Sequence, residues 1–364
     1  MLTSSPRRPP ARTPRRSSLR ALAVFLAAAL ALPLAGCLPS RIVVDLAPTV
    51  GEFEATTVLA DPAADPAGPA VALIDVSGVI SHVSPPGVVP TPSTVDRVVS
   101  RLRAAADDPD VRAVVLRVNS PGGTVAASDS LYREIRAHQR TTGHPVVVSM
   151  ADLATSGGYY VSLAADELIA QPSTITGSVG VIVQTFNLSA AMQRVGVAGE
   201  AVVSHPNKDV ANPFEPRDPD HYAILQTIVD DFYDQFRERL RADRPALTGS
   251  ARFDELTDGR VLTGRAAAEA GLVDSLGDLR DAFDAAKRRA GLDAARLVRF
   301  HAPGAPPSSL YSASAAAAAL PGPAAETASP AADAARALLD RAGPASQPDP
   351  GFYYLWRPPG SLLP

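Results

Sequence analysis

The sequence predicts an α/β protein with a mostly parallel sheet. From about residue 71 to residue 290, short apolar runs alternate with amphipathic stretches of helical period, and such alternation is typical of parallel strands joined by right-handed helical crossovers. Of the 364 residues, 46% are hydrophobic and 20% are charged, which is enough to bury a substantial core. The chain has a single cysteine, so an internal disulfide is excluded.

The strands are expected where apolar and β-branched residues form short runs bounded by turn residues. These runs are VALIDV (71–76), AVVLRV (113–118), PVVVSM (145–150), ELIAQ (167–171), SVGVIV (178–183) and EAVVS (200–204). Helical spacing of apolar residues predicts helices through Val95 and Leu102, through Leu131 and Ile135, around residue 266, and over 279–290. A long helix is expected over 219–243, and its apolar stripe is expected to pack in the core, with an interface or substrate contact as the alternative.

The charge balance argues against nucleic-acid binding. The first 20 residues hold six arginines and no acidic residue, and the remaining 28 basic and 38 acidic side chains give a formal charge of −10. Proteins that bind nucleic acid neutralise phosphates with clustered basic residues, and the body lacks that pattern.

The amino terminus has the three-part order of an export signal. The basic residues 1–20 precede the apolar run 21–32, whose 12 residues are too few to span a bilayer as an ordinary helix. The sequence Leu34-Ala35-Gly36-Cys37 resembles the bacterial lipobox, so residues 1–36 are expected to be removed and Cys37 to carry the lipid. A plain secretory signal and an uncleaved anchor are the alternatives, and Arg15-Arg16 is only a weak match to a twin-arginine signal.

Two segments outside the predicted folded body, residues 71–300, have the composition of flexible chain. Residues 37–70 are expected to be a tether, and residues 301–364 an Ala/Pro-rich mobile tail that ends in GFYYLWRPPGSLLP. The aromatic residues at the end of this tail suggest that it reaches an active site or a partner subunit.

Glycine pairs and hydroxyl groups follow two of the predicted strands, where loops of α/β folds present reactive groups. Residues 119–123 (NSPGG) could expose backbone N–H groups or could form an ordinary turn. In residues 154–160 (ATSGGYY), Ser156 opens a predicted helix, and the N–H of Gly157 could stabilise an oxyanion. The alternative role for Ser156 is that of a helix N-cap.

A nucleophilic serine needs a base, and lysine is almost absent from this chain. There are two lysines against 32 arginines, and none of the six histidines stands in a recognisable triad motif. Because arginine does not deprotonate in proteins, Lys208 in HPNKD is a candidate for a role that arginine cannot fill; a surface lysine is the alternative.

The motifs NSPGGTVAASDSLYREI, PVVVSMADLATSGGYYVSLAADELIAQPSTITGSVGVI, PNKDVANPF and DGRVLTGRAAAEAGLVDSLG together resemble the signal peptide peptidase A family, which has the Clp protease/crotonase fold of repeated β-β-α units. The resemblance covers about residues 71–290. It implies that Ser156 is the nucleophile, Lys208 the general base and Ser178 the hydroxyl that orients the lysine. It also implies that Gly157 and Gly123 are oxyanion donors.

The resemblance further implies a membrane-anchored serine peptidase that degrades signal peptides and other short apolar peptides, with no metal or cofactor. This chain has one copy of the repeat, like the short form of the family, so a ring-shaped homo-oligomer with the dyad shared between protomers is expected. The catalytic body would lie on the exported side of a bacterial membrane. The alternatives are a catalytically silent scaffold lipoprotein that organises membrane partners and an acyl-CoA enzyme of the crotonase type, which export disfavours.

Overall fold

The computed structural model describes residues 53–84, 91–304, 306, 307 and 309–312, together with the backbone of 353–355. The chain divides into a unit of Met1–Leu46, which lies outside the described residues, and a unit of Ala47–Pro364, which contains all of the described residues. The predicted signal and Cys37 also lie outside the described residues. In the described part of the chain, no helix is both long enough and apolar enough to cross a membrane.

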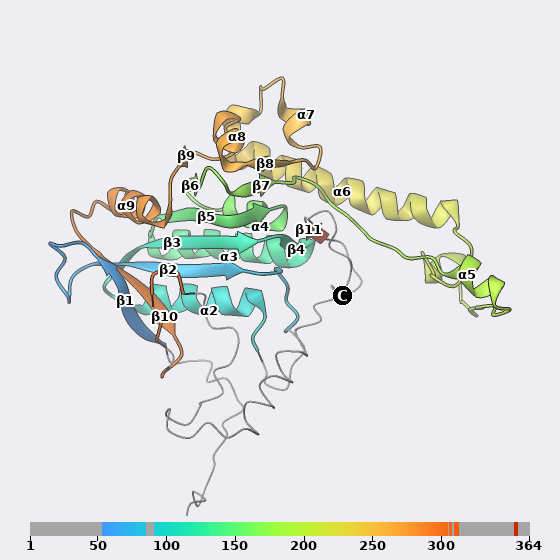
Figure 1. The fold of residues 1–364 in the computed structure, drawn as a ribbon, viewed down its shortest axis with the longest axis horizontal. Coiled ribbons are helices and arrows are strands. Elements are labelled where there is room, and N and C mark those ends of the chain that lie inside the picture. Colours follow the sequence, from blue (N-terminus) through green and yellow to red (C-terminus); the bar gives the residue numbers. More distant parts are fainter. Residues whose placement is uncertain (1–52, 85–90, 305, 308, 313–352, 356–364) are drawn as a thin grey trace, which may run out of the picture. The chain divides into compact units, whose positions relative to one another are not determined.

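Strands and helices alternate through most of this unit (Figure 1). The strands are β1 (Glu54–Ala60), β2 (Ala70–Ser77), β3 (Val111–Ser120), β4 (Gly122–Thr124), β5 (Val146–Thr155), β6 (Glu167–Ala170), β7 (Ile175–Gly177), β8 (Val261–Thr263), β9 (Ser275–Leu276), β10 (Arg296–His301) and β11 (Tyr353–Leu355). The helices are α2 (Thr94–Asp107), α3 (Val125–Thr142), α4 (Gly157–Ser162), α5 (Ser189–Arg194), α6 (Pro219–Asp243), α7 (Phe253–Leu256), α8 (Gly264–Glu269) and α9 (Leu279–Ala290), with 3-10 turns η1 (Pro206–Asp209) and η2 (Pro245–Leu247).

The main sheet has the strand order β1-β10-β2-β3-β5-β6-β9. All neighbours along this order are parallel except β1 and β10, and β7 adds a further parallel pair with β5 before β8 pairs with it antiparallel. The predicted α/β class with a mostly parallel sheet is therefore confirmed. The succession β3-β4-α3 is the clearest of the expected β-β-α units.

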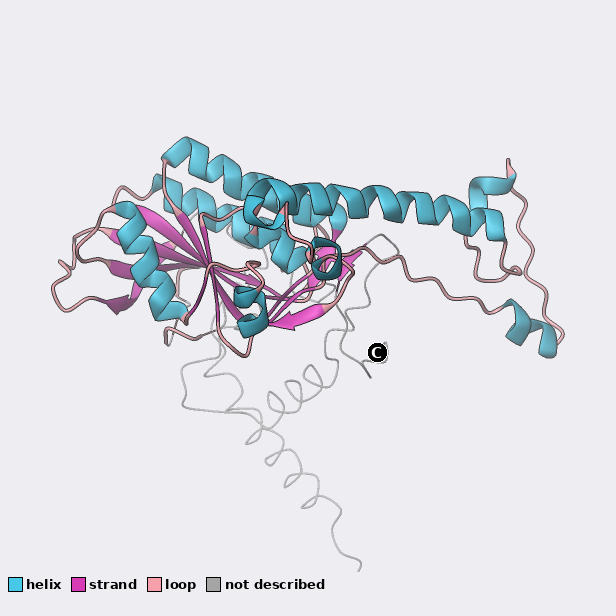
Figure 2. Ribbon diagram, turned by 90° about the horizontal axis from the view of Figure 1, so that it is seen from above, coloured by secondary structure: helices cyan, strands magenta, loops and turns pink. Residues whose placement is uncertain are grey.

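The core lies on both faces of the central strands, as expected for a parallel sheet covered by helices. Ile74, Leu116 and Val148 point to the face that α2, α3 and α4 cover, and the alternate residues of the same strands face α9. This double burial explains why VALIDV, AVVLRV and PVVVSM are apolar without alternation. Figure 2 shows the helices flanking the sheet.

The folded body is longer at both ends than the sequence predicted. β1 lies inside the predicted tether and pairs antiparallel with β10, so the tether prediction is wrong for 54–60. After β10, Arg117 donates hydrogen bonds to the carbonyls of Leu310 (3.1 Å) and Ser312 (2.8 Å), and Arg299 also donates to Ser312. Residues 309–312 are therefore fastened to the body rather than part of the predicted mobile tail, whose residues 313–352 and 356–364 lie outside the described residues.

Two predicted strands, SVGVIV and EAVVS, form no strand in the described chain. In the first, Ile182 forms only an isolated bridge, and the strand of this region, β7, uses residues 175–177 instead; the second has no strand residue. We define the arm as residues 182–225. Its hydrogen bonds join the segment to itself, as between Thr185 Oγ1 and Tyr222 Oη (2.7 Å) and between Leu188 N and Pro213 O (2.7 Å).

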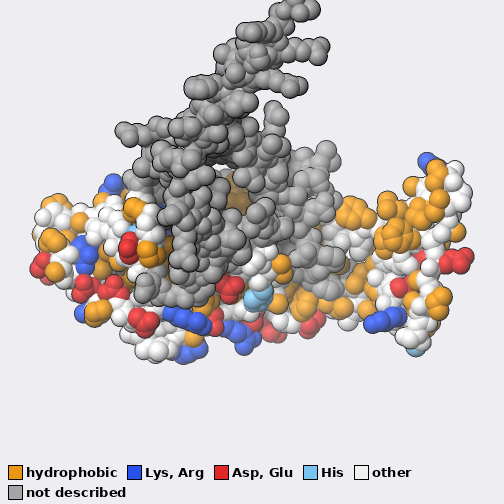
Figure 3. All heavy atoms as spheres, turned by 90° about the horizontal axis from the view of Figure 1, so that it is seen from below, with side chains coloured by type: hydrophobic (Ala, Val, Ile, Leu, Met, Phe, Trp, Pro, Cys, Tyr) orange, Lys and Arg blue, Asp and Glu red, His pale blue; other side chains and the backbone are white. Residues whose placement is uncertain are grey.

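The arm exposes an unusual amount of apolar surface. Nine of the thirteen large hydrophobic residues that are exposed in the described chain lie in it: Ile182, Phe186, Leu188, Val195, Val197, Val202, Val203, Phe214 and Ile224. Hydrophobic side chains gather over this part of the unit (Figure 3). On α6, Phe236 and Leu240 are buried as predicted, whereas the apolar stripe nearer the helix start stays partly exposed. Exposed apolar surface of this extent marks an interaction surface.

Candidate active site

Ser156 stands at a sharp turn between β5 and α4. Its backbone has φ 53° and ψ −115°, and its side chain is 1% exposed. The turn is held on both sides, because Ser156 N donates to Gly177 O (2.8 Å) and Tyr160 N donates to Ser156 O (2.8 Å). A positive φ is costly for a residue with a Cβ, and such strained backbone persists where the surroundings enforce it, often at functional sites.

The hydroxyl of Ser156 does not cap α4. Although Ser156 occupies the N-cap position, its side chain accepts no capping hydrogen bond within the described chain. Ser156 therefore stands at the N-cap position that the alternative expected, but its hydroxyl does not serve as the cap. Thr155, immediately before it, is also buried, with an Oγ1 that lacks a partner among the described residues.

Gly123 lies in β4, beside the helix that Ser156 opens. The two segments converge because Ser120 and Ala154 are paired where β3 and β5 end, and β4 and α4 follow directly. The glycine is required sterically, since a Cβ on Gly123 would stand 1.9 Å from the carbonyl oxygen of Ile80. Gly158 is similarly constrained, because a Cβ there would stand 2.8 Å from Ser120 O.

Ser120 was not assigned a role from the sequence, although it lies in the NSPGG motif. It is fully buried, its hydroxyl donates to Gly78 O (2.7 Å), and the same hydroxyl accepts from Gly122 N (3.1 Å). These bonds hold the turn into β4. A small hydroxyl before a Pro-Gly-Gly turn was the only signal in the sequence, and it is shared by ordinary turns.

Ser178 lies next to the Ser156 turn. It follows β7, whose Gly177 is the parallel partner of Thr155 and the acceptor for Ser156 N. Ser178 also has a positive φ of 53°, and its N–H donates to Arg260 O (2.7 Å). The structure thus brings Ser156, Gly157, Ser178 and the strand of Gly123 to one edge of the sheet.

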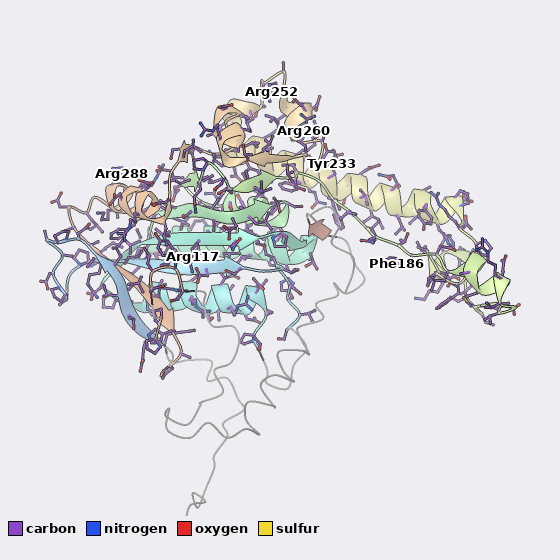
Figure 4. The ribbon with its side chains drawn as sticks, in the orientation of Figure 1. Arg117, Phe186, Tyr233, Arg252, Arg260 and Arg288 are labelled. Atoms are coloured by element: carbon purple, nitrogen blue, oxygen red, sulfur yellow. The ribbon has the colours of Figure 1, made fainter. Side chains whose placement is uncertain are left out.

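Lys208 is not brought to this edge within one chain. It lies exposed in η1, and η1 is tied to the start of α6 by the 2.9 Å contact between Pro206 O and His221 Nε2. Fifteen residues further along α6, the ring of Phe236 contacts the ring of Tyr160, with centroids 5.0 Å apart. At 1.5 Å per residue, the helix separates these two points by about 22 Å. Figure 4 shows Phe186 on the arm, apart from Arg117 on the central strands.

The other lysine, Lys287, is held by two carboxylates. Its Nζ lies 2.8 Å from Asp61 and 2.8 Å from Asp284. Partial burial acts to lower the pKa of Lys287, but the hydrogen bonds to Asp284 and Asp61 outweigh it and raise the pKa. A lysine held in its charged form cannot accept a proton, so Lys287 is unsuited to act as a base.

The histidines are distributed over α3 and the loop after it, the loop after β2, the arm and β10. The rings of His138 in α3 and His144 just after α3 meet edge-on, with centroids 5.4 Å apart, and burial and the neighbouring His144 lower the pKa of His138 to about 4. The others are His82 in the loop after β2, His205 and His221 in the arm, and His301, whose Nε2 lies 2.7 Å from Thr56 Oγ1. In the described residues, no group of three or more His, Cys, Asp or Glu could hold a metal ion.

A polar and aromatic network joins α4 to the base of α6. Tyr160 packs edge-on against Tyr132 and Phe236, and its hydroxyl donates to Asp129 (2.9 Å). Tyr132 in turn donates to Asp243 (2.9 Å) near the end of α6. The helix that begins after Ser156 and the helix that carries the arm therefore share one buried contact region.

Comparison with known proteins gives a family match and several related sequences. Residues 138–293 match peptidase family S49. The chain is 34% identical over 223 residues to the "Putative protease slr0021" of Synechocystis sp., covering 61% of this chain and 75% of that protein. It is 38% identical over 224 residues to Protease 4 of Salmonella typhi, covering 60% of this chain and 36% of that protein.

A third relative is the "Putative signal peptide peptidase SppA" of Enterococcus faecium, 32% identical over 201 residues, covering 55% of this chain and 58% of that protein. The chain therefore spans only part of the length of Protease 4 and of this SppA. Among solved structures, ClpP1 of Listeria monocytogenes aligns with a TM-score of 0.37 and 16% identity, covering 58% of this chain and 93% of that one. From the identity and coverage of the Synechocystis relative and the family match over 138–293, the chain belongs to peptidase family S49, the SppA family.

Proposed function

We propose that the protein is a serine peptidase in which Ser156 is the nucleophile and Lys208 of a second copy is the general base. The observation that carries this proposal is the position of the two residues in one chain. Ser156 stands in a buried, strained turn with glycine N–H groups beside it. Lys208 lies exposed in η1, close to the start of α6. The second lysine is engaged by carboxylates, which leaves Lys208 as the lysine suited to the role.

In the proposed reaction, the Ser156 Oγ forms a bond to the peptide carbonyl carbon while its proton passes to the Lys208 amine. The N–H groups of Gly157 and Gly123 stabilise the oxyanion. The C–N bond then breaks, the leaving amine takes the proton from Lys208, and an acyl-enzyme remains on Ser156. Lys208 next removes a proton from a water molecule, whose oxygen forms a bond to the acyl carbon. The bond from that carbon to the Ser156 Oγ breaks, the proton passes from Lys208 to the Ser156 Oγ, and the acid product leaves. Ser178, next to the Ser156 turn, would accept or donate a hydrogen bond that orients the amine.

Assembly would complete the site. The exposed apolar residues of the arm support an interaction surface, and in the proposed assembly the arm would rest on a second copy of the chain at the sheet edge where Ser156 lies. Such an arm-to-edge contact joins two different surfaces and is heterologous, and it forms a ring when the rotation between copies closes. Burying the arm tip would also desolvate the lysine amine, and desolvation favours the neutral form that can accept a proton.

The substrates proposed are signal peptides and other short or unfolded apolar peptides, bound as extended chains. The proposed site in the cell is a bacterial membrane, with the body on the exported side and the acylated Cys37 as anchor. Both proposals rest on the sequence, on the family and on the name of the Enterococcus faecium relative, a signal peptide peptidase. Labelling with a radioactive fatty acid tests the anchor, because Cys37→Ser should abolish incorporation; persistent incorporation would contradict it.

Mixing two inactive variants tests the shared dyad. Ser156→Ala and Lys208→Ala chains should each be inactive, but co-assembled in equal amounts they should recover about one quarter of the wild-type sites, because a site then needs an intact serine and an intact lysine from different copies. No recovery in verified mixed oligomers would contradict sharing between copies. Substantial activity of Lys208→Arg, which keeps the charge but cannot act as a base, would contradict the dyad itself.

A further inference from the structure

Helix α6 has buried side chains only toward its end. Of its 25 residues, all of which the structure describes, Phe236 and Leu240 are the buried ones. The helix starts at Pro219, next to the Lys208 turn, and ends at Asp243 (Figure 1). The direction of the helix at its packed end therefore decides where the lysine lies.

Apolar packing alone does not fix that direction closely. The hydrophobic effect is non-directional and depends on the area removed from water, so the two buried side chains hold α6 against the body without setting its angle. Charge-assisted hydrogen bonds are short and have a defined geometry. A charged group at the end of α6 is therefore the kind of group that can set the direction of the helix.

Asp243 supplies such a group. Its carboxylate is 11% exposed and binds helix α3 through both oxygens. Tyr132 Oη donates to Oδ2 (2.9 Å), and Arg136 Nη2 donates to Oδ1 (2.8 Å). Arg136 Nε also donates to Tyr132 Oη (3.1 Å), which closes a triangle of hydrogen bonds. We call Tyr132, Arg136 and Asp243 the clamp.

The clamp also reaches the helix that follows Ser156. Arg136 Nη2 donates to the carbonyl of Leu163 at the end of α4 (3.3 Å), and the ring of Tyr132 meets the ring of Tyr160 edge-on, with centroids 5.7 Å apart. Tyr160 N in turn donates to Ser156 O (2.8 Å). The clamp thus ties the end of α6 to the same frame of α3 and α4 that carries the Ser156 turn.

We propose that Asp243, through its bonds to Tyr132 and Arg136, is a positioning residue for Lys208: it fixes the direction of α6 and so the place where the lysine meets Ser156 of a second copy. The catalytic part of this inference rests on the proposed function, whereas the direction of α6 can be measured without catalysis. Asp243 stands at the opposite end of α6 from the lysine and does not contact the reacting atoms. Its loss should lower kcat and leave KM unchanged, because substrate binds at the edge that carries the serine.

Mixed oligomers show on which chain Asp243 acts. When Ser156→Ala and Lys208→Ala chains are mixed, each working site takes its lysine from the first chain and its serine from the second. Asp243→Ala on the lysine-supplying chain should lower kcat about tenfold, whereas on the serine-supplying chain it should change kcat by less than about twofold, because misplacement of a reacting group is costly in rate. An equal loss in the two arrangements is what a merely structural role predicts, and it would overturn the inference.

Two further substitutions separate positioning from a loss of folding. Tyr132→Phe keeps the ring that contacts Tyr160 and removes the hydroxyl that binds Asp243, so on the lysine-supplying chain it should lower kcat about threefold. Asp234→Ala, at an exposed position of the same helix, is the matched control and should leave kcat unchanged. A loss of activity with Asp234→Ala and none with Tyr132→Phe or Asp243→Ala would contradict the inference.

Single-molecule fluorescence energy transfer reports the direction of α6 in solitary chains. In the Cys37→Ser chain, dyes at Arg103→Cys on α2 and Val202→Cys on the arm, both exposed positions, follow the distance from body to arm. The chain with Asp243 intact should give a narrow distribution of transfer efficiency, Asp243→Ala a broader or shifted one, and Asp234→Ala the same one as the intact chain. An identical distribution in all three chains would overturn the inference.

The two measurements also separate this inference from the proposed function. A distribution altered by Asp243→Ala, together with no hydrolysis of any peptide by the wild type, would refute the peptidase and support the control of α6 by the clamp. Efficient hydrolysis that Asp243→Ala leaves unchanged on either chain, together with an unaltered distribution, would refute the inference and leave the peptidase standing.

Discussion

The turn at Ser156 makes a prediction about stability that does not depend on catalysis. We expect the Ser156→Gly variant to be more stable than the Ser156→Ala variant, although both lose the hydroxyl and both should be inactive. The comparison between these two variants isolates the backbone, because the residue at 156 has φ 53° and ψ −115°. Glycine reaches this conformation freely, whereas alanine keeps the Cβ that disfavours it.

The magnitude follows from two opposing effects. Holding a non-glycine residue in such a region costs about 1–3 kcal/mol. Glycine offsets part of this gain, because it increases the conformational entropy of the unfolded chain by an equivalent of about 0.4–1 kcal/mol. The net expectation is that Ser156→Gly exceeds Ser156→Ala by about 1 kcal/mol in free energy of unfolding.

Urea denaturation of both variants measures the difference, and Glu134 supplies the control. Glu134 is exposed in the middle of α3, so Glu134→Gly should be less stable than Glu134→Ala by about 1 kcal/mol. The glycine variant should therefore be the more stable of the pair at position 156, and the alanine variant the more stable at position 134. If Ser156→Ala proves as stable as Ser156→Gly or more stable, the turn is not strained and the argument fails.

Three further predictions concern the lysines, β4 and a buried histidine. Lys208→Met should lower kcat at least 10²-fold and leave the urea midpoint unchanged. Lys287→Met should leave kcat unchanged and lower the free energy of unfolding by about 1 kcal/mol. Loss of kcat in Lys287→Met and not in Lys208→Met would show that Lys287 is the base. Gly123→Ala places a Cβ against a carbonyl oxygen and should lower kcat/KM by about 10²–10³-fold, while Gly249→Ala, which meets no atom within 4 Å, should be neutral. Burial and a second imidazole lower the pKa of His138 to about 4 in the folded chain. As pH falls from 6.5 toward 4, His138 is therefore protonated in the unfolded chain but not in the folded chain, and the free energy of unfolding decreases. Between pH 7 and pH 4.5, the free energy of unfolding of the wild type should decrease by roughly 2 kcal/mol more than that of His138→Leu, as measured by urea denaturation. Equal decreases in the two proteins would contradict the lowered pKa of His138.

Elements with strong local patterns were predicted closely from the sequence. The helix over 219–243 has the bounds observed for α6, because Asp218 caps it and Pro219 occupies its first turn. The helix over 279–290 likewise matches α9, which begins at a capping box and ends before Gly291 in the left-handed conformation. The three apolar runs of the central strands were found because burial on both faces removes polar residues from them.

Elements that depend on distant partners were not predictable in this way. β1 reads as polar linker because its partner, β10, is more than 200 residues away, and no local pattern reports that pairing. EAVVS has the composition of a strand, but the arm offers it no neighbour, and Val202 is fully exposed. β-propensity reports how well a residue fits a sheet surface, so it fails where no sheet is present.

The candidate site likewise has one part that the sequence could predict and one part that it could not. Ser156, Ser178 and the strand of Gly123 meet because the carboxyl ends of neighbouring parallel strands share one edge, which the strand order makes foreseeable. The separation of Lys208 from that edge depends on the arm, whose hydrogen bonds join the segment to itself and whose sequence carries no regular helix or strand pattern that reports its course. The pairing of β11 with β4 was foreshadowed only by aromatic residues near the end of the chain.

The length of α6 beyond its packed end makes it a lever. With its base held near Phe236 and the Lys208 turn about 22 Å away, a rotation of only 5° at the base would move that turn by about 2 Å. Misplacement of a reacting group by about 1 Å is enough to cost about 10²-fold in rate. A solitary chain could not hold an amine to that tolerance, so the surface on which the arm rests would set the catalytic geometry. Specific activity should then rise steeply with protein concentration, and dilution alone would switch the peptidase off.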